Sequence, residues 1–429
     1  MYEEKDSRVE AFRQLKKEIR RSESHLVVGI DIAKHNHHAF FGTATGKTLL
    51  KRLVFANDAE GFNKLLTYVE AVKTKHVLEK VVVGLEPTGN YHKPLAAFLL
   101  ERHVDVVLVS GKAVTNNREM LDNRWDKNDT KDSANIADLV SQGKFMYYDH
   151  PVLPLQDLRN LLSFKRRLKK QEHGLRVRIR NHLLAQYFPE LDRYYGQSES
   201  MGLSVVRWCL SPAAIADMGY EHFERLISPG DRKTLTQQER LKTIWRKARN
   251  SIGCQAGEAL GFEARMMVEW LKQIREAIRI TEKKIKEVCL AFPAYSFMLT
   301  IPGFGPDVSS RVLAAIGDPY RFANHKQVLK LAGWDLSASR SGKKSNTIRP
   351  VISKKGKAEL RYALYQAALV ASTRTDFFVM YYTNKLHGRE REKGIKTKMR
   401  VKLAAKLLII AWTLMKKKEA FDPSHLQLQ

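Results

Sequence analysis

Residues 26–33 read LVVGIDIA, a nearly continuous apolar run that carries a single carboxylate, Asp31. A short apolar run bounded by polar residues is typical of a buried β-strand. A second such run, VVVGL at 81–85, follows a stretch whose apolar residues recur every three or four positions, as in a helix. These two runs and the helix between them predict a sheet with helices packed against it.

The rest of the first 150 residues extends this pattern. Further strands are expected at 37–43, 48–57 and 105–109, and helices at 59–75, 93–103 and 129–143. Asp58 stands where it can cap the first of these helices. Three early strands followed by alternating helices and strands predict a mixed α/β domain over residues 1–150.

Long helices are expected after this domain. A strongly basic helix over 155–184 and a second helix over 257–291, with apolar residues close to a 3.5 spacing, are expected to pair as an antiparallel coiled-coil arm. Residues 190–255 would be inserted at its tip. The arm would span 151–293, and an α-helical C-terminal domain would span 294–429.

The charge of the chain points to a polyanionic partner. There are 74 Lys and Arg against 46 Asp and Glu among 429 residues, a formal charge of +28, and the pI is about 9.9. Nucleic acid is the first candidate and an anionic membrane surface the second. The longest apolar run, 407–415, is too short to span a bilayer, and the N-terminus lacks the apolar core of a signal peptide. Three scattered cysteines suit a reducing compartment, so we expect a cytoplasmic protein without a membrane segment.

Carboxylates occur at positions where a metal site could form. Asp31 lies in the first apolar strand, Glu86 follows the strand at 81–85, and Asp129 and Asp132 begin a predicted helix three residues apart. Taken singly, each has an ordinary interpretation as a strand-end or helix-capping residue. Together they are the oxygen ligands that Mg²⁺ or Mn²⁺ requires, and two such ions can promote phosphodiester displacement.

Several motifs resemble one protein family. The stretches VVGIDIAK (27–34), GLEPTGNYHKPLAAFL (84–99) and KNDTKDSANIADL (127–139) are similar to the DEDD, RuvC/RNase H-like domain of a family of bacterial insertion-sequence transposases. That family also includes the Piv-type DNA invertases. Residues 301–334, 339–343 and 352–368 resemble its second transposase domain.

The resemblance implies a RuvC-like fold and a specific chemistry. It implies that Asp31, Glu86, Asp129 and Asp132 form the metal-binding tetrad and that Ser341 is a nucleophile that attaches covalently to DNA. It also implies a structured guide RNA, the bridge RNA, that pairs with donor and target DNA.

The residues around Ser341 permit this role without requiring it. A serine in a basic loop is usually solvated or in contact with a phosphate. Neighbouring cations could hold a scissile phosphate; they are Arg340, Lys343 and Lys344. No histidine lies nearby in sequence to act as a base, so activation by a metal or by a group from the other domain would be needed. The carboxylates and Ser341 could form one composite site that acts on the same phosphate, or they could form two separate sites.

Two other features suggest contacts with a nucleic-acid backbone. Gly303 and Gly305 precede an apolar-periodic helix, as in a helix-hairpin-helix that binds a phosphate, although a plain helix turn has the same pattern. The basic arm could equally be a solvated helix face, but its density of charge favours a nucleic-acid-facing stripe. Its first members are Arg166, Arg167, Lys169 and Lys170.

The sequence therefore predicts a bridge-RNA-guided DNA recombinase that acts as a dimer or tetramer at the bacterial nucleoid. It would cleave and rejoin strands by Mg²⁺-dependent transesterification. Two alternatives stay open: a RuvC-type endonuclease that uses water in place of Ser341, and a non-catalytic nucleic-acid-binding protein whose carboxylates are structural.

Overall fold

The computed structural model describes most of the chain and divides it into two compact units. The described residues are 7–20, 22–122, 129–148, 151–195, 199–208, 211–228, 234–337 and 351–425. The first unit comprises Met1–Pro151 and Tyr320–Ala323, and the second comprises Val152–Pro319 and Asn324–Gln429.

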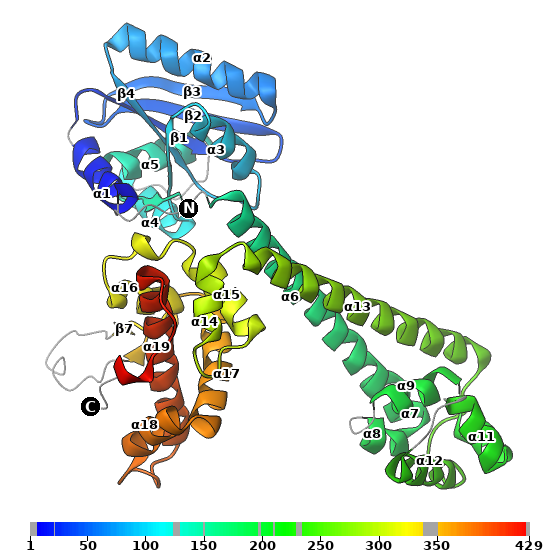
Figure 1. Cartoon of the computed structure of the whole chain (residues 1–429). Coiled ribbons are helices and arrows are strands. Elements are labelled where there is room, and N and C mark those ends of the chain that lie inside the picture. The colour runs from blue at the N-terminus through cyan, green and yellow to red at the C-terminus, as the bar shows by residue number, and fades with distance from the viewer. Residues whose placement is uncertain are drawn as a thin grey trace, which may run out of the picture. The chain divides into compact units, whose positions relative to one another are not determined.

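A mixed six-stranded sheet forms the centre of the first unit (Figure 1). Its strands are β1 (His25–Asp31), β2 (Asn36–Thr43), β3 (Thr48–Ala56), β4 (Lys80–Leu85), β5 (Asp105–Leu108) and β6 (Met146–Tyr147). They lie in the order β3-β2-β1-β4-β5-β6. Strands β1, β4 and β5 are parallel, and the other neighbours are antiparallel. The predicted mixed α/β class is confirmed, and β6 is a strand that the sequence pattern did not indicate.

Helices cover both faces of this sheet. They are α1 (Ser7–Ile19), α2 (Ala59–His76), α3 (His92–Leu100), α4 (Gly111–Asp122) and α5 (Asp129–Ser141). Leu26, Val28 and Ile30 of β1 pack with α2 and α3, whereas Val27 packs on the opposite face with α1, α4 and α5. Alternate residues of a strand point to opposite faces, so one apolar run supplies both cores. The predicted cap is present, since Asp58 accepts a 2.8 Å hydrogen bond from Gly61 N.

Two glycines let α5 lie directly on the sheet. A Cβ atom at Gly29 of β1 would come within 2.1 Å of the Ser133 carbonyl oxygen of α5. A Cβ atom at Gly84, its register partner on β4, would come within 2.5 Å of the Val140 side chain. Only residues without a side chain allow this close approach. The backbone of α5, which carries Asp132, therefore lies directly against β1, and its side chains pack against β4.

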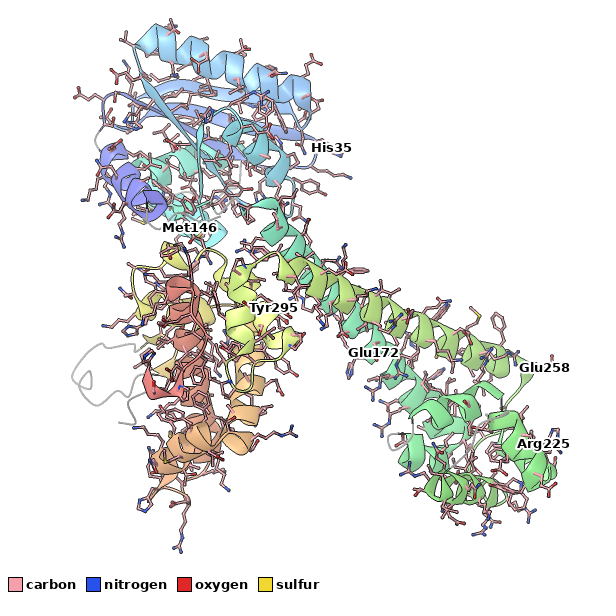
Figure 2. The ribbon with its side chains drawn as sticks, in the orientation of Figure 1. His35, Met146, Glu172, Arg225, Glu258 and Tyr295 are labelled. Carbon is pink, nitrogen blue, oxygen red and sulfur yellow. The ribbon has the colours of Figure 1, made fainter. Side chains whose placement is uncertain are left out.

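Two long helices lie side by side in the second unit. Helix α6 (Leu153–Arg178) continues through a π-helical turn (Ile179–Leu184) and packs along α13 (Glu258–Leu290). Glu172 of α6, labelled in Figure 2, accepts a 3.2 Å hydrogen bond from Arg275 of α13. The paired helices agree with the predicted arm, whereas a coiled coil in the strict sense stays a prediction.

The region between the arm helices, which sequence patterns left unassigned, folds into a helical bundle. Its core is shared with the adjoining ends of the arm, where Ile179 and Met267 are buried in the same cluster. Phe188, Leu203, Phe223 and Leu241 are fully or almost fully buried in it. Its helices are α7 (Ala185–Tyr187), α8 (Pro189–Tyr195), α9 (Glu199–Trp208), α10 (Pro212–Asp217), α11 (Tyr220–Ile227) and α12 (Leu235–Ala248).

The remainder of the second unit is also helical, with a small two-stranded ladder. It contains α14 (Pro293–Leu299), α15 (Pro306–Ile316), α16 (His325–Ala332), β7 (Leu336–Ser337), β8 (Val351–Ile352), α17 (Ala358–Arg374), α18 (Asp376–Leu386), α19 (Ile395–Lys417) and a short 3₁₀ turn at Pro423–His425. Another 3₁₀ turn, Pro319–Arg321, begins at the last residue of this stretch of the second unit and continues into Tyr320–Ala323 of the first. Helix α19 packs against α14, α16, α17 and α18. It buries the apolar run at 407–415, where Leu407 and Ala411 are fully covered. None of the described helices combines the length and apolar character needed to cross a bilayer.

Candidate active site

Two predicted site carboxylates lie at the ends of neighbouring parallel strands. Strands β1 and β4 are paired in register up to Ile30 and Leu85, so Asp31 and Glu86 follow at the same level. Parallel neighbours lie about 4.8 Å apart. Asp31 and Glu86 are partly buried. Because alternate residues share a face, Asp31 lies on the same face as Gly29, which is the face that α5 covers.

Glu86 lies against the first residue of α4. A Cβ atom at Gly111 would come within 2.6 Å of Glu86 Oε1. A carboxylate is stabilised at a helix N-terminus, where backbone N–H groups and the helix dipole carry positive charge. Glycine at position 111 therefore lets the start of α4 approach the Glu86 carboxylate.

Asp132 on α5 is buried and ion-paired. Its side chain is 4% exposed, and its Oδ1 lies 2.6 Å from Arg118 Nη2 and accepts a 2.9 Å hydrogen bond from Arg118 Nε of α4. A buried carboxylate without such a partner would be strongly destabilising. Arg118 therefore compensates the buried Asp132 carboxylate with a guanidinium partner.

A buried amide network fixes α4 against α5 and so places Arg118. Asn117 donates 2.8 Å hydrogen bonds to Asn135 Oδ1 and Asp138 Oδ2, and Asn135 donates a 2.6 Å bond to Val114 O. Sequence reasoning missed this network and Arg118. The available signal was the three-residue spacing of Asp132, Asn135 and Asp138, which puts polar groups on one helix face that packs on the core.

The structure brings Asp31, Glu86 and Asp132 to one face of the sheet, but it does not assemble a metal centre from them. Among the described side chains, no three His, Cys, Asp or Glu groups lie close enough to hold a metal ion. Asp129 opens α5, and its side chain lies outside the described residues. The tetrad therefore stays a prediction. The three described carboxylates fit a hard cation by donor type, with one oxygen of Asp132 engaged by Arg118.

The predicted nucleophile Ser341 lies outside the described residues, as do Arg340, Lys343 and Lys344. Strands β7 and β8, which flank that segment, pair through Leu336 with Ile352 and Ser337 with Val351. Ser337 and Val351, the described residues that border this segment in sequence, are thus paired with each other.

The two glycines of the predicted phosphate-binding turn differ in their surroundings. Gly303 has a φ of +88°, and a Cβ atom there would come within 2.5 Å of the Ala367 carbonyl oxygen of α17. Its need for glycine is therefore explained by packing within the second unit. Gly305 precedes α15 and has open space around it. Phosphate contact at these residues stays a prediction.

The predicted basic residues of the arm are exposed on α6. They are Arg166, Arg167, Lys169 and Lys170. Lys165, next to them in sequence, is instead buried and paired with two carboxylates. Lys169 also contacts Glu172 at 3.1 Å. The stripe is accessible to a polyanion, and its nucleic-acid role stays a prediction.

Comparison with known proteins gives the class of this protein, which is a transposase. A transposase model of the DEDD type from IS110 elements matches residues 28–189, and a model described as transposase of the IS116/IS110/IS902 family matches residues 295–383. The two models follow one another in order and together cover more than half of the chain. The chain belongs to the IS110/IS116 family of transposases.

Relatives in this family match almost end to end. An uncharacterized 44.8 kDa protein of insertion element IS116 from Streptomyces clavuligerus is 25% identical over 92% of this chain and 96% of its own length. A pilin gene-inverting protein of Moraxella bovis is 23% identical over 93% of this chain and 98% of its own length. The likeness therefore extends over both units and is not confined to one domain.

Proposed function

We propose that this chain is the RNA-guided DNA recombinase of an insertion sequence, and that it cleaves and rejoins strands through Ser341. One observation carries the assignment as an enzyme that acts on DNA strands. Asp31 and Glu86 end neighbouring parallel strands beneath α5, whose Asp132 is buried on the same face, and all three lie within the part matched by the DEDD transposase model. Family membership supports DNA as the substrate.

The carboxylates would hold Mg²⁺ or Mn²⁺. Asp31, Glu86 and Asp132, together with Asp129, supply the oxygen ligands that these cations prefer. When bound, such ions stabilise negative charge on the attacking and leaving oxygens of a phosphodiester. Arg118 would act as a positioning residue that orients the Asp132 carboxylate.

Strand cleavage by Ser341 would conserve phosphoester bonds. Its Oγ attacks phosphorus and loses its proton, a new P–Oγ bond forms, and the bond from phosphorus to one DNA sugar oxygen breaks. That oxygen leaves as a hydroxyl after taking up a proton. A hydroxyl of another strand can then reverse the step, so rejoining needs no external energy source.

Guide RNA and subunit association complete the proposal. The bridge RNA would select sequences by base pairing while the protein reads backbone and shape, as in other RNA-guided systems. A chain of charge +28 suits two polyanionic partners. Recombination of two duplexes needs several active sites, so we infer a dimer or tetramer, with contacts through α6 and α13, acting on DNA in the bacterial cytoplasm.

Denaturing gels with end-labelled DNA test the nucleophile. With guide RNA and Mg²⁺, the wild-type protein should leave a protein-linked DNA product, and Ser341→Ala should leave none. Ser345→Ala, in the same basic segment, is the matched control and should retain the product. A Ser341→Ala protein that still forms the adduct would defeat the assignment, and free ends without any adduct would favour the hydrolytic nuclease.

A further inference from the structure

A basic cleft lies in the second unit, where α6 meets α15 and the start of α17. It encloses about 220 Å³ and is lined by four cationic side chains and one carboxylate. The charged residues are Arg159, Arg166, Arg311, Lys357 and Glu359. Sequence patterns assigned a role only to Arg166 among them. The cleft therefore carries a positive charge that neither the carboxylate site nor Ser341 explains.

Two of its cations are anchored on the end of α15. Arg159 Nε donates a 2.9 Å hydrogen bond to Ala314 O, and Lys357 Nζ donates a 3.3 Å bond to Ala315 O. Cations at a helix C-terminus satisfy its last carbonyls and its dipole. These contacts hold both side chains at the cleft.

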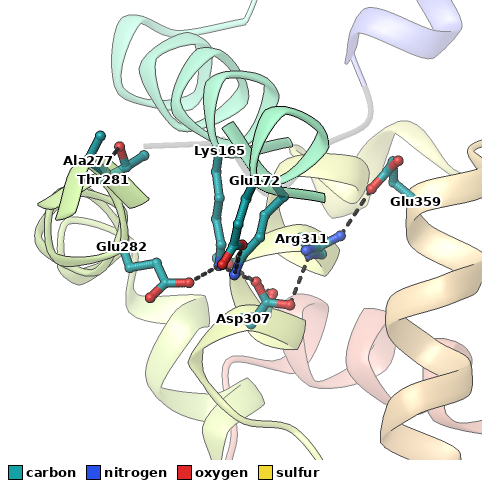
Figure 3. Close-up of polar contacts among 10 residues, drawn as sticks. Lys165, Glu172, Ala277, Thr281, Glu282, Asp307, Arg311 and Glu359 are labelled. Atoms are coloured by element: carbon teal, nitrogen blue, oxygen red, sulfur yellow. Dashed lines mark hydrogen bonds and ion pairs between the residues drawn. The ribbon is translucent and has the colours of Figure 1, made fainter. Parts of the chain in front are cut away.

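A third cation, Arg311, belongs to an ion network around the buried Lys165 (Figure 3). Its Nε lies 3.0 Å from Asp307 Oδ2, and the other Asp307 oxygen accepts a 2.7 Å bond from Lys165. Lys165 is 9% exposed at its side chain and lies 2.8 Å from Glu282 of α13. Asp307 thereby holds Arg311 at its Nε, while Nη1 of the same guanidinium donates to Glu359 (Figure 3).

Glu359 neutralises the cleft where it is open to solvent. Its carboxylate lies 3.0 Å from Arg311 Nη1 and 3.7 Å from Arg166 Nη1. Its side chain is 52% exposed and that of Arg166 is 63% exposed, so water screens the contact and the pair adds little stability. A carboxylate between two guanidinium groups occupies the position that a phosphate group can take, because both anions fit the guanidinium fork.

We propose that this cleft binds a phosphate group of a nucleic-acid backbone and that Glu359 is its internal competitor. The phosphate displaces the Glu359 carboxylate from Arg166 and Arg311, and Arg159 and Lys357 add to the positive field around it. The apolar walls, Leu162 and Leu360, can contact the adjoining sugar. The inference rests on the proposed function only in taking nucleic acid as the ligand.

Salt-dependent binding tests the proposal in the absence of chemistry. Anisotropy of a labelled duplex DNA of arbitrary sequence, and separately of a labelled single-stranded RNA, is measured in EDTA over a series of KCl concentrations with the full chain. Arg166→Gln should weaken binding and reduce the slope of log K against log salt by about one. Glu359→Gln should bind several-fold more tightly.

Arg246→Gln is the matched control, because it removes the same charge from an exposed position on α12. Its slope should equal that of the wild type. Both cleft residues are exposed, so unchanged circular dichroism should accompany the binding changes. The nucleic acid whose binding responds to these substitutions, DNA or RNA, is the source of the phosphate.

Three results would overturn the inference: an unchanged slope for Arg166→Gln with both nucleic acids, an equal loss for Arg246→Gln, or weaker binding by Glu359→Gln. Failure of the recombinase proposal gives a different result. The Ser341→Ala protein would then still form adducts, or no protein would form them, while the slope effects in EDTA remain.

Discussion

At the scale of single residues, Arg118 is the side chain on which the candidate active site most depends. It holds the nearly buried Asp132 through two contacts to one oxygen. We expect Arg118→Ala to destabilise the first unit by about 3 kcal/mol, because removing one member of a buried pair leaves an uncompensated charge. Urea unfolding, with hydrogen exchange of α4 and α5 peptides, measures the loss.

An exposed arginine gives the comparison. Arg102 is exposed, where it lies 3.9 Å from Glu101, donates a 3.1 Å hydrogen bond to Phe98 O and stacks on the Phe98 ring. Because these contacts are at the surface, Arg102→Ala should cost only about 1 kcal/mol. If the two substitutions lowered the free energy of unfolding equally, the ion pair with Asp132 would stabilise the fold no more than a surface contact does.

The sequence predicted the candidate carboxylates but not the residues that hold them. Asp31 and Glu86 could be predicted as site residues because a charged residue next to a buried strand differs clearly from its apolar neighbours. Arg118 was not, because α4 contains several polar residues and only the fold shows which one faces Asp132. The partners of a buried charge depend on contacts between distant segments, which local patterns do not contain.

Among the secondary-structure elements, the close packing of α5 on the sheet determines where Asp132 lies relative to Asp31 and Glu86. Gly29→Ala would push its Cβ into the Ser133 carbonyl, 2.1 Å away, so α5 must shift. Overpacking of this kind costs at least about 2 kcal/mol. We expect a lower thermal midpoint and a loss of strand joining from this single methyl group.

Gly174→Ala is the matched substitution in the second unit. Gly174 lies inside α6 with nothing near its missing side chain, so alanine should stabilise the helix by about 0.5–1 kcal/mol. Thermal unfolding of the two variants should therefore move in opposite directions. A stabilising Gly29→Ala would contradict the close contact between α5 and β1.

The junction of α6, α13 and α15 should be sensitive to acid. Burial opposes ionisation of Asp307, but Lys165 and Arg311 outweigh it and hold its pKa below the ordinary value. Its ion pairs therefore stabilise the folded junction above the ordinary aspartate pKa, and this stabilisation is lost as the pH falls through the lowered pKa. Hydrogen exchange of α15 amides should rise in that acidic range.

Lys165→Met should flatten this acid response, because Asp307 then loses its shortest ion pair, at 2.7 Å. Lys170→Met removes an exposed lysine on the same helix and should leave the response unchanged. An unaltered pH profile for Lys165→Met would show that the buried lysine does not set it.

At the scale of the whole molecule, most of the fold class followed from sequence and the insert did not. Alternating apolar runs predicted the sheet, and the near-heptad spacing predicted the paired helices α6 and α13. The bundle formed by residues 185–248 is built from short helices of three to fourteen residues. Segments this short carry little periodic signal, and their core residues meet only after folding.

Combined variants can show whether the carboxylates of the first unit and Ser341 of the second serve one reaction. Residues that act together in one step lose their effect together, so Asp132→Asn, Ser341→Ala and the double variant should show the same residual strand joining. The hydrolytic alternative predicts that Ser341→Ala keeps releasing free ends and that only Asp132→Asn stops them. Quantifying adducts and free ends for all three variants, with Ser345→Ala as the active control, decides between these outcomes. A double variant much weaker than either single one would mean that the two groups contribute independently.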